Sequence, residues 1–160
     1  MRFRALGRSF SVSDVLVQEI SEASPHAVWE ALKSNPTAVL VDVRTIAEWD
    51  YIGLPVLESL GKEVLKVEWM EFPEMTRNEH FAAELLAQFK GNDPSAIYFI
   101  CRSGVRSLYA ARCLTAALEG TGRSIECINV TGGFEGDHDD NKHRGKINGW
   151  KVCGLPWCQP

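Results

Sequence analysis

The sequence lacks the features that mark several large classes of protein. Its 160 residues contain no apolar run that approaches the length of a membrane span, and no internal repeat or low-complexity tract. The formal net charge is −4, so the composition does not indicate general affinity for nucleic acid. We therefore expect neither a membrane nor a nucleic-acid partner.

Cysteine is also sparse, and the spacings of the five cysteines suggest no disulfide framework. No secretory signal is visible, so we expect a reduced, cytoplasmic setting. The start of the chain holds three arginines before its first acid, Asp14, which gives it some of the character of a transit peptide. The commoner situation is a frayed terminus that leads into the first strand.

The composition that remains is that of an ordinary globular domain, with 45% hydrophobic and 24% charged residues, and the length suits a single domain. We divide the chain into an N-terminal arm at 1–10, one folded domain at 11–136 and a C-terminal extension at 137–160 that packs on the domain. The apolar side chains of the extension that we expect to cover the domain are Trp150, Leu155 and Trp157.

Apolar runs alternate with helical patterns along the domain. The expected strands are 15–21, 38–43, 63–69, 96–100 and 124–130. Helices are expected after the Ser24-Pro25 pair, after Thr45 with Glu48 at capping-box spacing, and across 81–89 and 105–118. This alternation predicts an α/β fold with a mainly parallel central sheet of about five strands and helices on both faces. Ligands of such sheets bind at the carboxyl ends of the strands.

The stretch IYFICRSGVRS, residues 97–107, places a cysteine followed by two arginines where an apolar strand gives way to a helical pattern. Gly104 permits the tight turn that this change requires. The amides of such a turn can converge on an anion, and the N-terminus of the following helix adds partial positive charge. Arg102 and Arg106 add two full charges. Cysteines in such surroundings ionise more readily than a free thiol, so we expect Cys101 to react as a thiolate.

The competing interpretation of Cys101 is a buried core cysteine near surface arginines, and the flanking cations argue against it. Two other cysteines have no arginine or lysine pattern of this kind beside them. Cys113 falls on the predicted helix and Cys127 within a strand, each among apolar neighbours. We expect both to be inert core side chains.

The segment VDVRTIAEW, the loop CRSGVRS and the segment VTGGFEGD, in this order, resemble the rhodanese-like sulfurtransferases. The resemblance covers roughly residues 11–134. In that family one strand ends in Asp-x-Arg, a later strand ends in the catalytic cysteine, and a double glycine follows the last strand. The positions that match are Asp42, Arg44, Glu48, Cys101, Arg102, Gly104, Arg106, Ser107, Gly132 and Gly133. The tail is similar to the ending of a group of bacterial single-domain rhodaneses.

The resemblance implies a catalytic domain that transfers sulfur by double displacement without a cofactor. Cys101 would take a sulfane sulfur from a small donor such as thiosulfate as a persulfide, and a thiol acceptor, or cyanide, would remove it. The donor-binding set implied is Arg102, Ser103, Gly104, Val105, Arg106 and Ser107. The supporting set implied is Asp42, Arg44, Glu48, Gly132 and Gly133. We expect Arg44 and Glu48 to form an exposed ion pair that fixes the turn beside the loop.

The sequence departs from the family pattern in two places. The segment after Asp-Val-Arg lacks the usual His-Ile pair, and Phe134 stands where Trp is common. These departures leave the loop intact and bear on the shape of the substrate.

Two other functions compete with sulfur transfer from a small donor. Cysteine phosphatases and arsenate reductases also hold a thiolate in an anion-binding loop. Tyrosine-phosphatase-like enzymes, however, place five residues between cysteine and arginine, and here four separate Cys101 from Arg106. The second alternative is a persulfide carrier or interaction module that delivers sulfur to a protein partner, and the presence of Cys101 is compatible with it.

The tail carries four metal-capable side chains. They are His138, His143, Cys153 and Cys158. Only the histidine spacing suits zinc, so we expect no metal site. Either tail cysteine could instead resolve a persulfide as a disulfide with Cys101.

Overall fold

The computed structural model describes residues 19–160, and the N-terminal arm at 1–10 lies outside the described residues. In chain order, the elements are β1 (Ser21–Ala23), α1 (Pro25–Ser34), β2 (Val39–Asp42), α2 (Ile46–Tyr51), β3 (Leu54–Pro55), the short 3-10 helix η1 (Glu58–Leu60), β4 (Leu65–Lys66), β5 (Met70–Glu71), β6 (Thr76–Arg77), α3 (Phe81–Gln88), β7 (Ala96–Ile100), α4 (Val105–Leu118), β8 (Glu126–Val130) and β9 (Trp157–Cys158).

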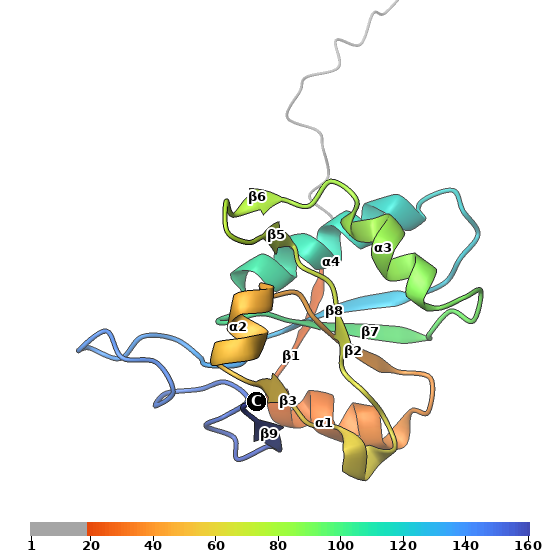
Figure 1. The fold of residues 1–160 in the computed structure, drawn as a ribbon. Helices are drawn as coiled ribbons and strands as arrows, with labels where there is room; N and C mark the ends of the chain where they lie inside the picture. The colour runs from red at the N-terminus through yellow and green to blue at the C-terminus, as the bar shows by residue number, and fades with distance from the viewer. Residues whose placement is uncertain (1–18) are drawn as a thin grey trace, which may run out of the picture.

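The centre of the fold is a five-stranded sheet with the strand order β1-β8-β7-β2-β4. All of its neighbouring strands pair in parallel. Helix α1 covers one face of this sheet, and α3 and α4 cover the other (Figure 1). The predicted α/β fold, with a parallel sheet and helices on both faces, is therefore confirmed. Because the five strands run the same way, their carboxyl ends meet at one edge of the sheet.

Alternate side chains of the central strands enter two separate cores. On β2, Val41 lies in the core under α3 and α4, whereas Leu40 lies in the core under α1. On β7, Phe99 joins the first core and Ile100 the second. This alternation explains why both strands appear in the sequence as unbroken apolar runs. The same alternation carries Cys101, the next residue, into the core on the α4 side.

Two helices begin at the capping residues that the sequence predicts. Ser24 precedes α1, and its Oγ accepts a hydrogen bond from the amide of Ala27 at 3.3 Å. Thr45 and Glu48 form the predicted capping box of α2. Thr45 Oγ1 accepts from the Glu48 amide at 3.3 Å, and the Glu48 carboxylate accepts from the Thr45 amide at 3.0 Å. The capping box folds the Glu48 side chain back toward the start of α2.

Several sequence-based boundaries differ from the structure. The predicted strand at 63–69 pairs within the sheet only at Leu65–Lys66. Beyond that pair, the amides of Val67 and Trp69 each donate a single hydrogen bond to the carbonyl oxygens of residues 42–43. The chain after Lys66 therefore continues alongside β2, but it is held there by these two hydrogen bonds and not by a regular strand pairing.

The first strand and the start of α4 also differ from expectation. Most of the predicted strand at 15–21 lies outside the described residues, and the observed strand β1 begins at Ser21. Val105 opens the apolar stripe that predicts the helix at 105–118, yet its side chain is 62% exposed. It is the first residue of α4, whereas Ala111 and Leu114, further along the helix, are buried.

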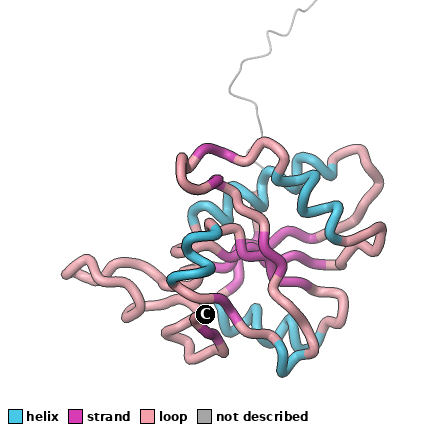
Figure 2. The backbone as a smooth tube through the Cα atoms, viewed as in Figure 1, coloured by secondary structure: helices cyan, strands magenta, loops and turns pink. Residues whose placement is uncertain are grey.

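The chain after Asp137 consists mostly of loops and turns (Figure 2). Trp150 is fully buried, and its ring meets Trp29 of α1 edge-on with the centroids 6.1 Å apart. Leu155 is also buried, and Trp157 is 39% exposed. The short strand β9 then pairs antiparallel with β3. None of the helices within residues 19–160 is long and apolar enough to cross a membrane.

Candidate active site

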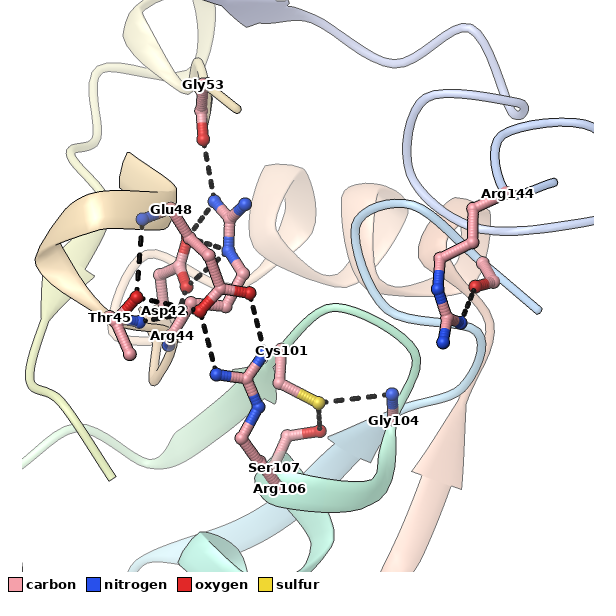
Figure 3. Close-up of polar contacts among 11 residues, drawn as sticks. Asp42, Arg44, Thr45, Glu48, Gly53, Cys101, Gly104, Arg106, Ser107 and Arg144 are labelled. Carbon is pink, nitrogen blue, oxygen red and sulfur yellow. Dashed lines mark hydrogen bonds and ion pairs between the residues drawn. The ribbon is translucent and has the colours of Figure 1, made fainter. Parts of the chain in front are cut away.

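Cys101 lies directly after β7, at the carboxyl edge of the sheet, and α4 begins at Val105 (Figure 3). Only 1% of the residue is exposed. Its Sγ accepts two hydrogen bonds, from the Gly104 amide at 3.1 Å and from the Ser107 hydroxyl at 3.1 Å. The sequence suggests a turn in which several amides converge. Within residues 19–160, the structure shows one backbone amide and one side-chain hydroxyl as hydrogen-bond donors to the sulfur. Both donors favour negative charge on the sulfur.

Two glycines allow the backbone to wrap around the sulfur. Gly104 has a φ of 105°, a left-handed conformation that side chains disfavour, and this conformation points its amide at Cys101. Gly133 lies so close to the loop that an added Cβ would come within 2.5 Å of the Cys101 carbonyl oxygen. Next to it, the amide of Phe134 donates to that same carbonyl at 2.8 Å. The predicted supporting role of the double glycine therefore has a structural basis at Gly133.

Asn129 connects several parts of the loop, a role that the sequence pattern did not predict. Its Nδ2 donates to the Gly104 carbonyl at 3.0 Å and to the Glu22 carboxylate at 3.2 Å. These bonds turn its Oδ1 toward the Ser107 hydroxyl, 2.6 Å away. A hydroxyl carries one hydrogen, so Ser107 donates either to Asn129 or to Cys101. The site can accommodate both a thiol, which donates to Ser107, and a thiolate, which accepts from it.

Arg106 of α4 forms a two-pronged ion pair with Glu48 of α2. Its Nη1 and Nη2 donate to the two carboxylate oxygens at 2.8 Å and 2.6 Å. Burial by itself raises the pKa of Glu48, but the hydrogen bonds from Arg106 and Thr45 and the charge of Arg106 outweigh it and lower this pKa from 4.5 to about 2. Glu48 is therefore ionised at neutral pH, and its charge compensates that of Arg106.

Arg44 forms its ion pair with Asp42, so the expected Arg44–Glu48 pair is wrong. Its Nε and Nη2 donate to the Asp42 carboxylate at 2.9 Å and 2.6 Å, and Nη2 also donates to the Gly53 carbonyl at 2.7 Å. The guanidinium carbon lies 4.2 Å from the ring centroid of Phe134. Residues two apart on an extended chain point the same way, which brings Asp42 and Arg44 together, whereas the capping box and Arg106 occupy Glu48.

A pocket of about 380 Å³ opens beside the cysteine loop, and we call it the Arg102 pocket. Its lining residues are Thr45, Ala47, Glu48, Phe72, Met75, Arg102 and Arg106. Cys101 is not among these lining residues, but Arg106 interacts electrostatically with it, so this part of the pocket lies near the buried sulfur. The Arg102 side chain is exposed, and within residues 19–160 it has no hydrogen-bond or ion-pair partner. The pocket thus combines one unpaired cation, one compensated cation and apolar side chains.

Comparison with known proteins agrees with this architecture. The uncharacterized protein RC0915 from Rickettsia conorii is 36% identical over 129 residues, which cover 81% of this chain and 89% of that protein. The crystal structure of Rv0390 from M. tuberculosis is 42% identical, covers 88% of this chain and 98% of its own, and superposes with a TM-score of 0.74. The chain belongs to the family of RC0915 and Rv0390. No protein-family model matches it.

The fold of this chain is rhodanese-like. The solution structure of the polysulfide-sulfur transferase homodimer from Wolinella succinogenes superposes on this chain with a TM-score of 0.50. The two sequences are 20% identical, and the match covers 88% of this chain and 80% of the other. At this level of identity the likeness concerns the fold.

In this member of the RC0915 and Rv0390 family, the sequence-predicted donor set divides between two hollows. Arg102 and Arg106 line the Arg102 pocket. Ser103, Gly104 and Val105 instead line a separate hollow of about 360 Å³. Ser107 lines neither of these two, since it is fully buried beneath the sulfur.

The remaining cysteines and the tail histidines take no visible part in the site. Burial raises the pKa of both the Cys113 and the Cys127 thiols, as expected of core cysteines. Cys153 and Cys158 are exposed and free. Within residues 19–160, no three His, Cys, Asp or Glu side chains gather in a way that could hold a metal ion, so the tail residues gain no support as a zinc site.

Proposed function

We propose that this protein is a sulfurtransferase that carries sulfane sulfur on Cys101. The observation that carries the proposal is the pair of hydrogen bonds, from the Gly104 amide and the Ser107 hydroxyl, that the Cys101 sulfur accepts at the N-terminus of α4. The rhodanese-like fold and the likeness of this fold to a polysulfide-sulfur transferase support it. This setting favours a thiolate, the form in which cysteine acts as a nucleophile.

The reaction would proceed in two displacements. In the first, the Cys101 thiolate attacks the outer sulfur of the donor, a new S–S bond forms on Cys101, and the old bond to that sulfur breaks. The donor's remainder leaves with the electron pair; for thiosulfate it is sulfite. In the second, an acceptor thiolate, or cyanide, attacks the outer sulfur of the persulfide. Cys101 then leaves as the thiolate with which it began, so the cycle needs no external oxidant or reductant.

The loop supplies the electrostatic part of this mechanism. The Gly104 amide donates to the sulfur, and the Ser107 hydroxyl, 3.1 Å away, donates to it when it turns from Asn129; both then stabilise the charge that Cys101 carries before attack and regains after transfer. Arg102, at the mouth, attracts the anionic donor. Cys101 is 1% exposed, and we expect the donor to reach it from the Arg102 pocket, whose lining includes both Arg102 and Arg106.

The test is sulfur loading of the purified protein. Incubation with a sulfane donor should give a protein one sulfur atom heavier by intact mass spectrometry, and cyanide should then release thiocyanate. Cys101→Ala should abolish both. Cys153→Ala is the matched control, because this cysteine is exposed and free, and it should keep both. Full activity in Cys101→Ala would contradict the proposal, as would rapid hydrolysis of an aryl phosphate without any sulfur loading.

A further inference from the structure

The mouth of the Arg102 pocket exposes more apolar surface than an inorganic donor requires. Phe72 and Met75, in the turn between β5 and β6, are 51% and 41% exposed, although large apolar side chains are usually covered. Ala47 of α2 lies in the same lining. Thiosulfate carries only sulfur and oxygen atoms and would gain nothing from these side chains.

The charge of the pocket is also low for a dianion. Both carboxylate oxygens of Glu48 are bound to Arg106, and the two side chains are only 18% and 21% exposed. A dianion that bound Arg106 would have to displace Glu48 and leave that carboxylate without its partner. Arg102 is the remaining cation of the lining, so the pocket presents a net single positive charge.

We infer that the Arg102 pocket selects monoanionic sulfane donors with an apolar substituent, such as organic persulfides R–S–S⁻, over dianionic thiosulfate. This inference rests on the proposed sulfurtransferase function and names its donor class. Arg102 pairs with the single charge, while Phe72 and Met75 cover the substituent R. The Cys101 thiolate attacks the outer sulfur, the S–S bond of the donor breaks, and R–S⁻ leaves with the electron pair. Charge and oxidation state balance, because one thiolate replaces another.

The test compares two stable donors that differ in charge and in apolar content. Benzenethiosulfonate is a monoanion with a phenyl ring and releases benzenesulfinate, whereas thiosulfate is a dianion and releases sulfite. Both deliver one sulfur to Cys101, and cyanide serves as the acceptor for both. We expect kcat/KM for benzenethiosulfonate to exceed that for thiosulfate by about tenfold or more, which corresponds to about 1.4 kcal/mol.

Two variants separate the apolar and the charge contributions to this ratio. Phe72→Ala removes the ring at the mouth and should lower the ratio by about threefold or more. Glu48→Gln keeps a capping-box residue but leaves Arg106 uncompensated, so the ratio should fall by about twofold to fivefold through better use of thiosulfate. Ile147→Ala is the matched control, since Ile147 is 54% exposed and does not line the pocket. It should leave the ratio unchanged.

The outcomes distinguish this inference from the proposed function. If neither donor loads sulfur onto Cys101, the proposed function fails and the inference fails with it. If both donors load Cys101 but thiosulfate is used equally well or better, the function stands and the donor class is wrong. A ratio that Phe72→Ala leaves unchanged would also overturn the role given to the apolar mouth. These comparisons hold even if Glu48→Gln does not fold.

Discussion

Two arginine–carboxylate pairs lie near the cysteine loop, and they differ in their access to solvent. The Arg44–Asp42 pair follows β2, and both side chains are fully buried. The Arg106–Glu48 pair bridges α4 and α2, and its side chains are 21% and 18% exposed. Both are two-pronged, with closest contacts of 2.6 Å. Geometry alone therefore does not separate their roles.

The surroundings of the two ion pairs distinguish their roles. The Arg44 guanidinium is enclosed by Asp42, the Gly53 carbonyl and the Phe134 ring, so no ligand can reach it without unfolding that part of the chain. Arg106 and Glu48 line the Arg102 pocket, where a ligand can meet either charge. The comparison indicates that the sealed pair holds the structure together, whereas the open pair tunes the charge that a donor meets.

The largest expected effect on stability is at the buried Arg44–Asp42 pair. Arg44→Met removes the partner of a buried carboxylate and should lower the free energy of unfolding by about 3–5 kcal/mol. Denaturant titration of the variant measures this loss. The double variant Asp42→Leu/Arg44→Met should recover part of it, because no unpaired charge then remains buried.

A control on the surface calibrates the first prediction. Arg77 pairs with Glu79, and these side chains are 55% and 70% exposed. Arg77→Met should therefore change stability by less than about 1 kcal/mol. Equal losses in Arg44→Met and Arg77→Met would show that enclosure does not set the role of the pair.

The same substitution at the open pair should affect activity more than folding. Arg106→Met should cost about 1–3 kcal/mol of stability, between the values for surface and buried pairs. It also leaves the Glu48 carboxylate uncompensated at the mouth, so kcat/KM for an anionic donor should fall by about tenfold or more. Steady-state kinetics and denaturant titration on the same preparation measure both quantities. Activity that falls only in proportion to the folded fraction would make Arg106 purely structural.

Among the predictions for the open pair, the pH dependence is the smaller effect. The pKa of Glu48 is about 2 in the folded protein, below its ordinary value of 4.5, so the unfolded chain binds the proton more readily. The stabilisation is present above about pH 4.5 and is lost as the pH falls toward 2. Between pH 7 and pH 4, the stability advantage of the wild type over Glu48→Gln should shrink by about 1 kcal/mol. An advantage that stays constant over this range would contradict the pairing of Glu48 with Arg106.

Local features of the fold could be predicted from the sequence because they depend on neighbours in the chain. The strand at 96–100, the cap at Ser24 and the capping box at Thr45 all appear where their spacing places them. The strand predicted at 63–69 is much shorter in the sheet, because its pairing depends on how β2 is positioned and not on its own composition.

In the candidate site, as in the fold, the features that depend on local sequence could be predicted, and the long-range contacts could not. The position of Cys101 between a strand and a helix, with Gly104 in the turn, follows from local sequence alone. The contact between Asn129 and the loop joins residues 22 to 25 positions apart, and nothing in the pattern around Asn129 distinguishes it from an ordinary strand residue. A polar side chain in an apolar strand that ends at the active edge is the signal that could have found it.

The sequence by itself determined where the sulfur nucleophile stands and which turn surrounds it, since both depend on dihedral preferences and hydrogen bonds within a few residues. Only the tertiary structure decided that Arg106 binds Glu48 and which side chains line the mouth of the Arg102 pocket. Glu48 and Arg106 are 58 positions apart, and Phe72 lies on a hairpin between them in sequence. Their meeting depends on the order in which the parallel strands pack, which brings distant chain segments to one edge of the sheet.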